Sequence, residues 1–249
     1  LHGFSHHGFF GLLFFRIESS AAQGFVDFKL FQNPTYTGAT LSNFLLNGVA
    51  GTLLVSLQLV QLGGNMTAQQ AGGLTLGYAI AIIAFIRVGE KLLQRFGARK
   101  PMIWGCLIVG VSIVMLSPAN LLLEDYNTLA IIGYTLFGVG LAFYATPSTD
   151  AALSALPAAQ AGSGAGIYKM ASSLGAAFGV AISAAIFTAL SANPESIAWL
   201  EGVITFAGRQ DNLAVREAAI IALMFNVFMV VVAIMSIMLT VPKFVGKKN

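Results

Sequence analysis

The 249-residue sequence has few charged residues, and this scarcity excludes most classes of protein at once. Asp, Glu, Lys and Arg make up 9% of the chain, whereas 57% of the residues are hydrophobic and the mean hydropathy is +0.80. A soluble domain carries charge on about a quarter of its residues, because its surface faces water. The composition therefore excludes a soluble globular protein, a disordered chain and a nucleic-acid-binding protein.

Cysteine and histidine are also scarce, which excludes several kinds of site. Cys106 is the one cysteine, so a disulfide framework or a cysteine-based metal cluster cannot form. His2, His6 and His7 cluster near the start of the sequence without acidic or cysteine partners, and we expect them to be ordinary loop residues. The sequence has neither a nucleophile elbow nor a phosphate-binding glycine loop. We therefore expect no catalytic residue, no metal site, no cofactor and no enzymatic activity.

Long apolar runs are abundant, and six of them are long enough to cross a membrane. A crossing helix needs about 20 apolar residues, about twice the length of a barrel strand, so helices are expected. A shorter run at 8–17 indicates the end of a further span whose start is missing, as in a piece of a longer chain. The prolines, Pro147 among them, fall at or outside the span ends, where a missing N–H costs least. The expected spans are residues 36–62, 70–89, 102–118, 128–147, 163–190 and 217–241.

The sign of the charges orients these spans. If the even-numbered connections share one side, that side holds eleven basic residues, and the other side holds Arg209 and Arg216 with six acidic residues. Basic loops stay in the cytoplasm, so we expect a multi-pass plasma-membrane protein whose C-terminus is cytoplasmic. The long opposite connection, 192–216, is either an amphipathic helix anchored by Trp199 or a loop folded over the helix ends. The basic set is Arg16, Lys29, Arg87, Lys91, Arg95, Arg99, Lys100, Lys169, Lys243, Lys247 and Lys248.

Amides and tyrosines occur within the expected spans, where a polar group usually faces a cavity or a partner helix. Aromatic walls with a few amides suit large, flat, amphipathic molecules. The alternative is hydrogen bonding between helices by the amides and placement of the tyrosines at the membrane interface. Asn43 and Asn47 share one helix face, which favours the cavity for these two. The candidate substrate-binding residues are Asn43, Asn47, Gln58, Tyr78, Tyr134, Tyr144, Tyr168 and Asn226.

Carboxylates and small residues give two further expectations. We expect no carboxylate within the spans proper; Asp150 is the nearest. It either pairs with Lys169 to close the basic end or is solvated independently. A stripe of glycines in 163–190 indicates a close helix–helix seam, either static or able to slide. The stripe consists of Gly162, Gly164, Gly166, Gly175 and Gly179.

The basic segment 91–100, Lys-Leu-Leu-Gln-Arg-Phe-Gly-Ala-Arg-Lys, is short and lies between two apolar runs. Gly97 suits the tight turn between them. The segment resembles the second-half copy of the cytoplasmic loop motif of major facilitator transporters, Gly-x-Leu-Ala-Asp-Arg-x-Gly-Arg-Arg, although Glu90 and Gln94 replace its glycine and aspartate. Charge alone favours an ordinary cytoplasmic loop. The candidate gating residues, which include the matching positions, are Arg95, Gly97, Arg99, Lys100, Asp150 and Lys169.

Residues 35–52, 144–150 and 166–180 resemble the fourteen-span drug:proton antiporters of that superfamily, and among them the Nor-type quinolone efflux pumps of Gram-positive bacteria. The resemblance extends from about residue 25 to residue 242. It implies an all-α integral membrane protein in which 1–34 ends a linker span and forms an interfacial segment. Residues 35–242 then form the C-terminal six-helix bundle of a major facilitator fold, and 243–249 are a basic cytoplasmic tail.

The same resemblance implies a function. It implies alternating-access efflux of hydrophobic or amphipathic drugs, such as quinolones, cationic dyes and biocides, in exchange for protons. The proton gradient would supply the energy, and the proton-carrying carboxylates would lie mainly in a missing N-terminal bundle. The expected partners are the lipid bilayer, the drugs and that bundle. The alternatives are a transporter of the same fold for a small metabolite or lipid component, and a non-transporting membrane subunit.

Overall fold

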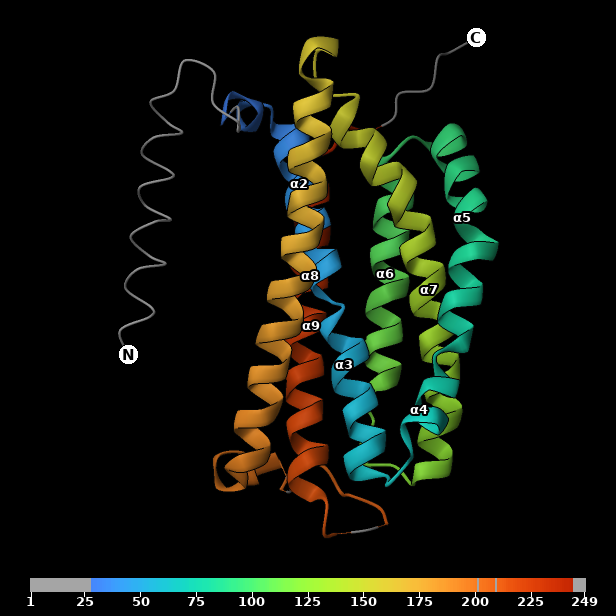
Figure 1. The fold of residues 1–249 in the computed structure, drawn as a ribbon, viewed down its shortest axis with the longest axis vertical. Helices are drawn as coiled ribbons and strands as arrows, with labels where there is room; N and C mark the ends of the chain where they lie inside the picture. The colour runs from blue at the N-terminus through green and yellow to red at the C-terminus, as the bar shows by residue number, and fades with distance from the viewer. Residues whose placement is uncertain (1–27, 201, 209, 244–249) are drawn as a thin grey trace.

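The structure, a computed structural model, describes residues 28–200, 202–208 and 210–243, and all regular elements in these ranges are helical (Figure 1). Six helical segments are long and apolar enough to cross a membrane, which confirms the all-α, six-span prediction. Most of the expected segment 1–34, including the three histidines, and nearly all of the expected tail lie outside the described residues.

The spans run close to the predicted limits, and two of them are interrupted. Short 3-10 turns complete the elements: η1 (Phe28–Gln32), η3 (Ala158–Gln160), η4 (Pro194–Ser196) and η5 (Ala198–Leu200). In chain order the spans are α2 (Pro34–Gly48) with α3 (Gly51–Gln58) and the π-helical turn η2 (Leu59–Gly63), α4 (Ala68–Leu74) with α5 (Leu76–Phe96), α6 (Arg99–Leu116), α7 (Leu123–Leu153), α8 (Ala161–Ala192) and α9 (Leu213–Thr240).

Local capping explains where several helices begin and end. The Asn33 side chain accepts hydrogen bonds from the backbone N–H groups of Thr35 and Tyr36, and Pro34 supplies the first helical residue of α2. At the far end of α5, Gly97 has φ 72° and ψ 178°, a conformation that suits glycine. The turn that the sequence predicts at Gly97 is therefore confirmed.

Pro147 corrects one expectation, because it lies inside α7 and not at the end of that helix. A proline lacks the N–H that would bond the carbonyl of Phe143 one turn earlier. The helix continues to Leu153 because the residues beyond the proline, Ser148, Ala151 and Ala152, are buried.

The first span breaks near its middle, where Val49 and Ala50 separate α2 from α3 (Figure 1). The N–H of Ala50 donates to the carbonyl of Asn47 at 3.1 Å, and the N–H of Thr52 donates to the carbonyl of Val49 at 2.9 Å. Each bond reaches back three residues, as in a 3-10 helix, and not four, as in an α-helix. Gly48 and Gly51 flank the break. Their missing side chains allow α8 to approach this part of the first span closely.

The expected glycine seam is confirmed for part of the stripe. A Cβ at Gly175 would collide with the carbonyl of Phe44, and one at Gly179 with the carbonyl of Gly48. Gly162 and Gly166 have open space around them. The close contact between α8 and the first span therefore lies in the C-terminal part of the stripe.

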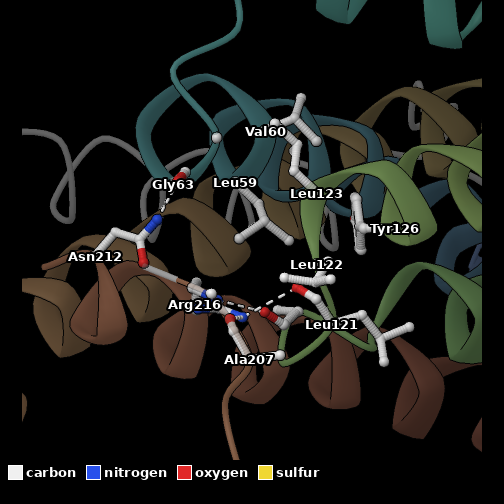
Figure 2. Close-up of a pocket in the computed structure, with 13 residues that line it drawn as sticks. Leu59, Val60, Gly63, Leu121, Leu122, Leu123, Tyr126, Ala207, Asn212 and Arg216 are labelled. Carbon is white, nitrogen blue, oxygen red and sulfur yellow. Dashed lines mark hydrogen bonds between the residues drawn. The ribbon is translucent and has the colours of Figure 1, made fainter. Parts of the chain in front are cut away.

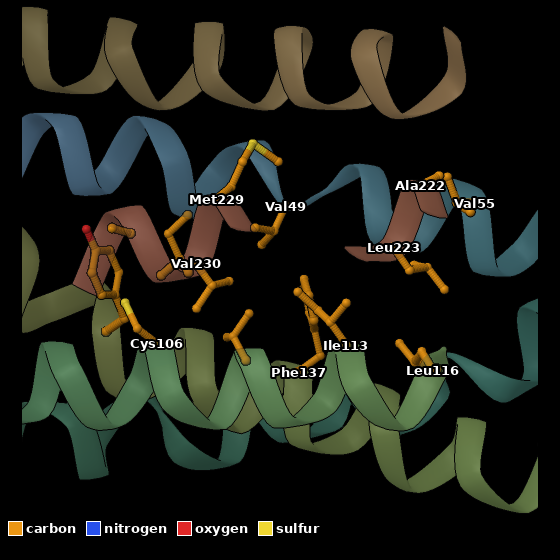
Figure 3. Close-up of a cluster of buried hydrophobic side chains, with 14 of the residues drawn as sticks. Val49, Val55, Cys106, Ile113, Leu116, Phe137, Ala222, Leu223, Met229 and Val230 are labelled. Carbon is orange, nitrogen blue, oxygen red and sulfur yellow. The ribbon is translucent and has the colours of Figure 1, made fainter. Parts of the chain in front are cut away.

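The core lies between α2, α3, α6, α7 and α9, with α5 and α8 at the flanks. Figure 3 shows Val49, Ile113, Phe137 and Leu223 converging from these helices, and all are at most 1% exposed. In the most apolar stretches of the α4–α5 and α8 spans, 17% and 22% of the residues are buried, against 44–50% in the other spans. The flanking helices therefore present the largest uncovered apolar surfaces.

The two ends of the bundle separate as the charges predict. At the upper end in Figure 1, here called the basic end, the Thr35 hydroxyl donates to the carbonyl of Thr240, and the α5–α6 loop lies nearby. The opposite end carries the α6–α7 and α8–α9 connections. In the latter, the described residues form short 3-10 turns and loop, with Ile197, Leu200 and Phe206 buried. Of the two alternatives for 192–216, the folded loop is the one observed.

Candidate functional site

A cavity of about 580 Å³ lies toward the basic end, between α2, α5, α7 and α8. Its apolar walls come from side chains such as Leu46 and Ile86, and a small set of polar residues interrupts them. Four of the eight candidate substrate-binding residues, from three different helices, line it together. The polar lining includes Asn43, Asn47, Tyr144, Thr149, Tyr168 and Lys169.

The two asparagines of α2 form an oriented pair at the cavity. The side-chain amide of Asn43 donates to the carbonyl of Tyr168 at 3.1 Å. The amide of Asn47 donates at 2.8 Å both to the carbonyl of Asn43 and to its side-chain oxygen. A backbone carbonyl only accepts, so these bonds fix which atom of each amide is nitrogen. The amide donors are thus used within the protein, and no described residue donates to Oδ1 of Asn47.

The two tyrosines of the cavity join the helices that surround it. The hydroxyl of Tyr144 on α7 lies 2.7 Å from that of Ser42 on α2. The hydroxyl of Tyr168 on α8 lies 2.7 Å from that of Ser148 on α7. Both rings are buried, each hydroxyl has a serine as its hydrogen-bond partner, and the rings supply apolar wall.

Two further candidates, Tyr134 and Asn226, lie outside the cavity and join helices. The hydroxyl of Tyr134 donates to Ser56 at 2.7 Å, and the amide of Asn226 donates to Ser183 at 3.0 Å. Both residues are fully buried. These two residues therefore make hydrogen bonds between helices, which is the alternative to lining a cavity that the sequence leaves open.

Tyr78 and Gln58 also lie away from the cavity. The ring of Tyr78 packs on Phe137, with ring centroids 5.9 Å apart, and so covers the core. Gln58 is half-buried near the end of α3, where its side-chain oxygen has no hydrogen-bond partner among the described residues. The structure does not bring either residue to the other candidates.

The basic loop between α5 and α6 gathers around one aromatic ring. The guanidinium of Arg95 lies 5.2 Å from the centre of the Phe96 ring, and the ammonium of Lys100 lies 5.7 Å from it. The same ring meets Trp104 edge-on at 5.2 Å. Cations over an aromatic ring are attracted by the partial negative charge of the ring face, so the side chains of the loop hold it in place.

Arg99, from the same loop, caps another helix. Its guanidinium donates to the carbonyl of Met238 at 2.7 Å and to that of Val241 at 3.2 Å, at the C-terminal end of α9. The last carbonyls of a helix have no partner within it and carry partial negative charge, so a cation there is stabilising. The loop is thereby tied to the end of the last span.

The structure does not bring Asp150 and Lys169 into an ion pair. Asp150 is exposed and accepts a hydrogen bond from Ser154 at 3.2 Å. Lys169 lines the cavity from α8 and has no ion-pair partner within 4.0 Å among the described residues. The two gating candidates therefore stand apart here, as in the second of the two alternatives drawn from the sequence.

Arg216 is the most connected charged side chain of the opposite end, and sequence reasoning placed it merely in a loop. It is 5% exposed within α9 and donates to the carbonyls of Ala119 at 2.5 Å, Leu121 at 3.1 Å and Ala207 at 2.8 Å (Figure 2). Its guanidinium also lies 5.2 Å from the ring of Phe206. One side chain thus joins α9 to two connections.

A small cavity of about 200 Å³ adjoins this cluster. Asn212 borders it and donates a hydrogen bond to the carbonyl of Gly63, at the end of the first span (Figure 2). Together Asn212 and Arg216 connect the first span, the α6–α7 connection and α9. Hydrogen bonds to backbone carbonyls therefore hold the opposite end together.

Glu217 corrects the expectation that no carboxylate lies within the spans. It is 1% exposed and belongs to α9, as does its neighbour Arg216. The apolar residues Leu213, Ala214 and Val215 precede the two charges, and this order could have indicated that the helix starts before them. In the part of the chain that the structure describes, no group of three or more His, Cys, Asp and Glu side chains could hold a metal ion.

Comparison with known proteins shows which family this chain resembles. Residues 35–225 match the Major Facilitator Superfamily. The chain is 45% identical over 233 residues to the quinolone resistance protein NorB of Staphylococcus aureus strain MRSA252, which is 93% of this chain and 46% of that protein. It is 46% identical, over the same shares, to the proteins of that name from strains bovine RF122 / ET3-1 and JH9. The chain spans about half the length of the curated relatives it matches.

Proposed function

Because this chain belongs to the major facilitator superfamily, we propose that it is the drug-binding half of a membrane exporter whose substrates include quinolones. The observation that carries the proposal is the cavity of about 580 Å³, in a chain 45% identical to a quinolone resistance protein. Apolar and aromatic walls bind an amphipathic molecule through buried area, and a few polar groups orient it. The protein would act by transport and not as an enzyme.

A second bundle would complete the site. The relatives are about twice as long as this chain, and the least buried apolar spans, α4–α5 and α8, flank the cavity. A bundle packed against these two helices would cover their apolar surfaces and close the cavity from the open side. Rocking of the two bundles would then expose the site to each side of the membrane in turn.

The proposed orientation follows from charge. Arg95, Arg99 and Lys100 gather at the basic end, and basic segments remain on the cytoplasmic side. The protein would therefore be a multi-pass protein of the plasma membrane with a cytoplasmic C-terminus, and the cavity would lie nearer the cytoplasm. An exporter takes up its substrate on that side.

We further propose that export is driven by proton entry. Proton coupling needs a carboxylate whose protonation changes between states. Among the described residues, no carboxylate lines the cavity, and Glu217 is the buried acid of the spans. The groups that exchange protons close to the drug would thus belong mainly to the other bundle.

Transport into inside-out membrane vesicles tests both parts of the proposal. Vesicles from cells that express the full-length gene product should accumulate norfloxacin, a quinolone, above vesicles that lack it. A protonophore should abolish the difference. Equal accumulation in the two kinds of vesicle would contradict drug export, and accumulation that survives the protonophore would contradict proton exchange.

A further inference from the structure

Lys169 is the one formally charged side chain among the described residues that line the cavity. It lies eight residues into α8, about 12 Å along the helix from Ala161 at 1.5 Å per residue. No described acid is within ion-pair distance of it. The described lining of the cavity therefore carries a net positive charge, and the residues beside Lys169 are apolar or neutral.

The other polar groups of the cavity are neutral, and most of them already donate to oxygens of the protein. The amides of Asn43 and Asn47 already donate to protein oxygens. The hydroxyl of Thr149 donates to the carbonyl of Ala145 at 3.0 Å, and the hydroxyls of the two tyrosines pair with serines. A substrate that enters therefore meets one charged donor, the ammonium of Lys169, beside the neutral hydroxyl of Ser172 and the open acceptor Oδ1 of Asn47.

Lys169 is exposed in this half of the protein. Once the proposed second bundle covers the cavity, water screens the charge of Lys169 less, and an anion beside it is favoured. An ammonium and a carboxylate form a charge-assisted hydrogen bond, which is about twice as strong as a neutral one. A permanently cationic molecule would be repelled by the same side chain. The donor set thus selects by charge, which shape and apolar walls do not.

We propose that Lys169 binds an acidic group of the exported molecule, so that this half of the protein selects carboxylate-bearing amphiphiles over purely cationic ones. The inference rests on the proposed function and specifies its substrate class. Quinolone antibiotics fit this class, since they carry a carboxylic acid on a flat ring system. The cationic dyes and biocides that the sequence resemblance implies do not fit it.

The test compares an acid with its ester in binding to the purified full-length protein in nanodiscs. Norfloxacin and its methyl ester differ only at the carboxylate, and equilibrium dialysis gives the dissociation constant of each. We expect the unaltered protein to bind the acid about tenfold more tightly than the ester, as one charge-assisted hydrogen bond allows. Equal affinities would overturn the inference without any substitution having been made.

Variants then assign the preference to one side chain. Lys169→Gln should weaken binding of norfloxacin about tenfold and leave the ester unchanged, whereas Lys169→Arg should keep most of the preference. Lys243→Gln removes an exposed charge beyond the end of α9, outside the cavity, and should change neither constant.

The remaining outcomes are equally decisive. If Lys169→Gln weakens the acid and the ester equally, the lysine shapes the protein or pairs with another protein group, and the inference is wrong. If it weakens neither, the acid binds elsewhere and the inference is again wrong. If the unaltered protein binds neither compound, the proposed drug-binding function is refuted and the inference fails with it.

Discussion

The two ends of this bundle are built differently. At the opposite end, Arg216 and Asn212 bond backbone carbonyls of separate segments, and the cavity there holds about 200 Å³. Toward the basic end the cavity holds about 580 Å³ and Lys169 lines it without an ion-pair partner among the described residues. Hydrogen bonds between protein groups fasten one end, while at the other end the charged side chain of the cavity pairs with no described acid.

This difference suits a transporter bundle that moves as a unit. A bundle rocks without coming apart only if its helices are held together away from the site that opens. The backbone hydrogen bonds of the opposite end give such a fastening, and the glycine seam of α8 gives close contact near the cavity. Stability and binding should therefore respond to different substitutions.

The largest effect is expected at the fastened end. Arg216→Gln would leave three carbonyls without their donor and a void beside Phe206, and should lower the free energy of unfolding by about 3–5 kcal/mol. Thermal unfolding in detergent measures the loss. Arg87→Gln, which removes an exposed charge from α5, is the matched control and should change stability by less than about 0.5 kcal/mol. Equal melting of the two variants would break the comparison between the ends.

The glycine seam should give the next largest effect. Gly179→Ala places a Cβ against the carbonyl of Gly48, and forcing the helices apart should cost about 1–3 kcal/mol. Gly166→Ala meets open space in the same helix and should be neutral or stabilising by up to about 1 kcal/mol, since alanine favours the helix. Thermal unfolding of the pair checks the opposite signs; a stable Gly179→Ala variant would show that the seam is loose.

A smaller effect is expected at the basic end, where Arg99 caps the C-terminal end of α9. Arg99→Gln removes the cation from the carbonyls of Met238 and Val241 and should cost about 1 kcal/mol of stability. If the loop also controls opening, norfloxacin transport into vesicles should slow while its dissociation constant stays the same. Lys91→Gln, at an exposed position of α5, should leave both quantities unchanged. Unaltered transport by Arg99→Gln would limit this arginine to a structural role.

The smallest effect on stability is expected inside the cavity. Asn47→Ala removes one amide and its two bonds to Asn43, and should cost less than about 1 kcal/mol, because water can replace part of the loss. It should nevertheless raise the dissociation constant of norfloxacin several-fold by removing the open acceptor. The ratio of these two effects is the check, since a variant that loses stability but binds normally would place Asn47 outside the substrate site.

Hydropathy and charge were sufficient to predict the six spans, because long apolar runs and basic loops are each local properties of the sequence. Gly97 was also predictable, since its turn needs a conformation that glycine adopts. Asn43 and Asn47 were recognisable as a pair because one helical turn places them on one face. These residues needed no knowledge of how the helices pack.

The positions of the other candidate residues depend on how the helices pack, which the sequence does not show locally. Tyr134 and Asn226 sit in helices that are apolar on every side, so periodicity does not distinguish the face toward a cavity from the face toward another helix. Arg216 was assigned to a connection and Glu217 to the first position of the last span, because charge normally ends a span. The burial of Arg216 depends on carbonyls of Ala119, Leu121 and Ala207, about 10 to 100 residues away in sequence, and hydrogen bonds of that kind leave no local pattern.

Cysteine protection tests most directly whether the larger cavity holds the drug, as we propose. Ala165 lines the cavity, Ser163 lies exposed at the start of α8, and Cys106 is fully buried, so a single new thiol can be followed at either position. With norfloxacin at ten times its dissociation constant, about a tenth of the sites remain free, and labelling of Ala165→Cys should slow about tenfold. Labelling of Ser163→Cys should not change. Equal labelling of Ala165→Cys with and without the drug would contradict the claim.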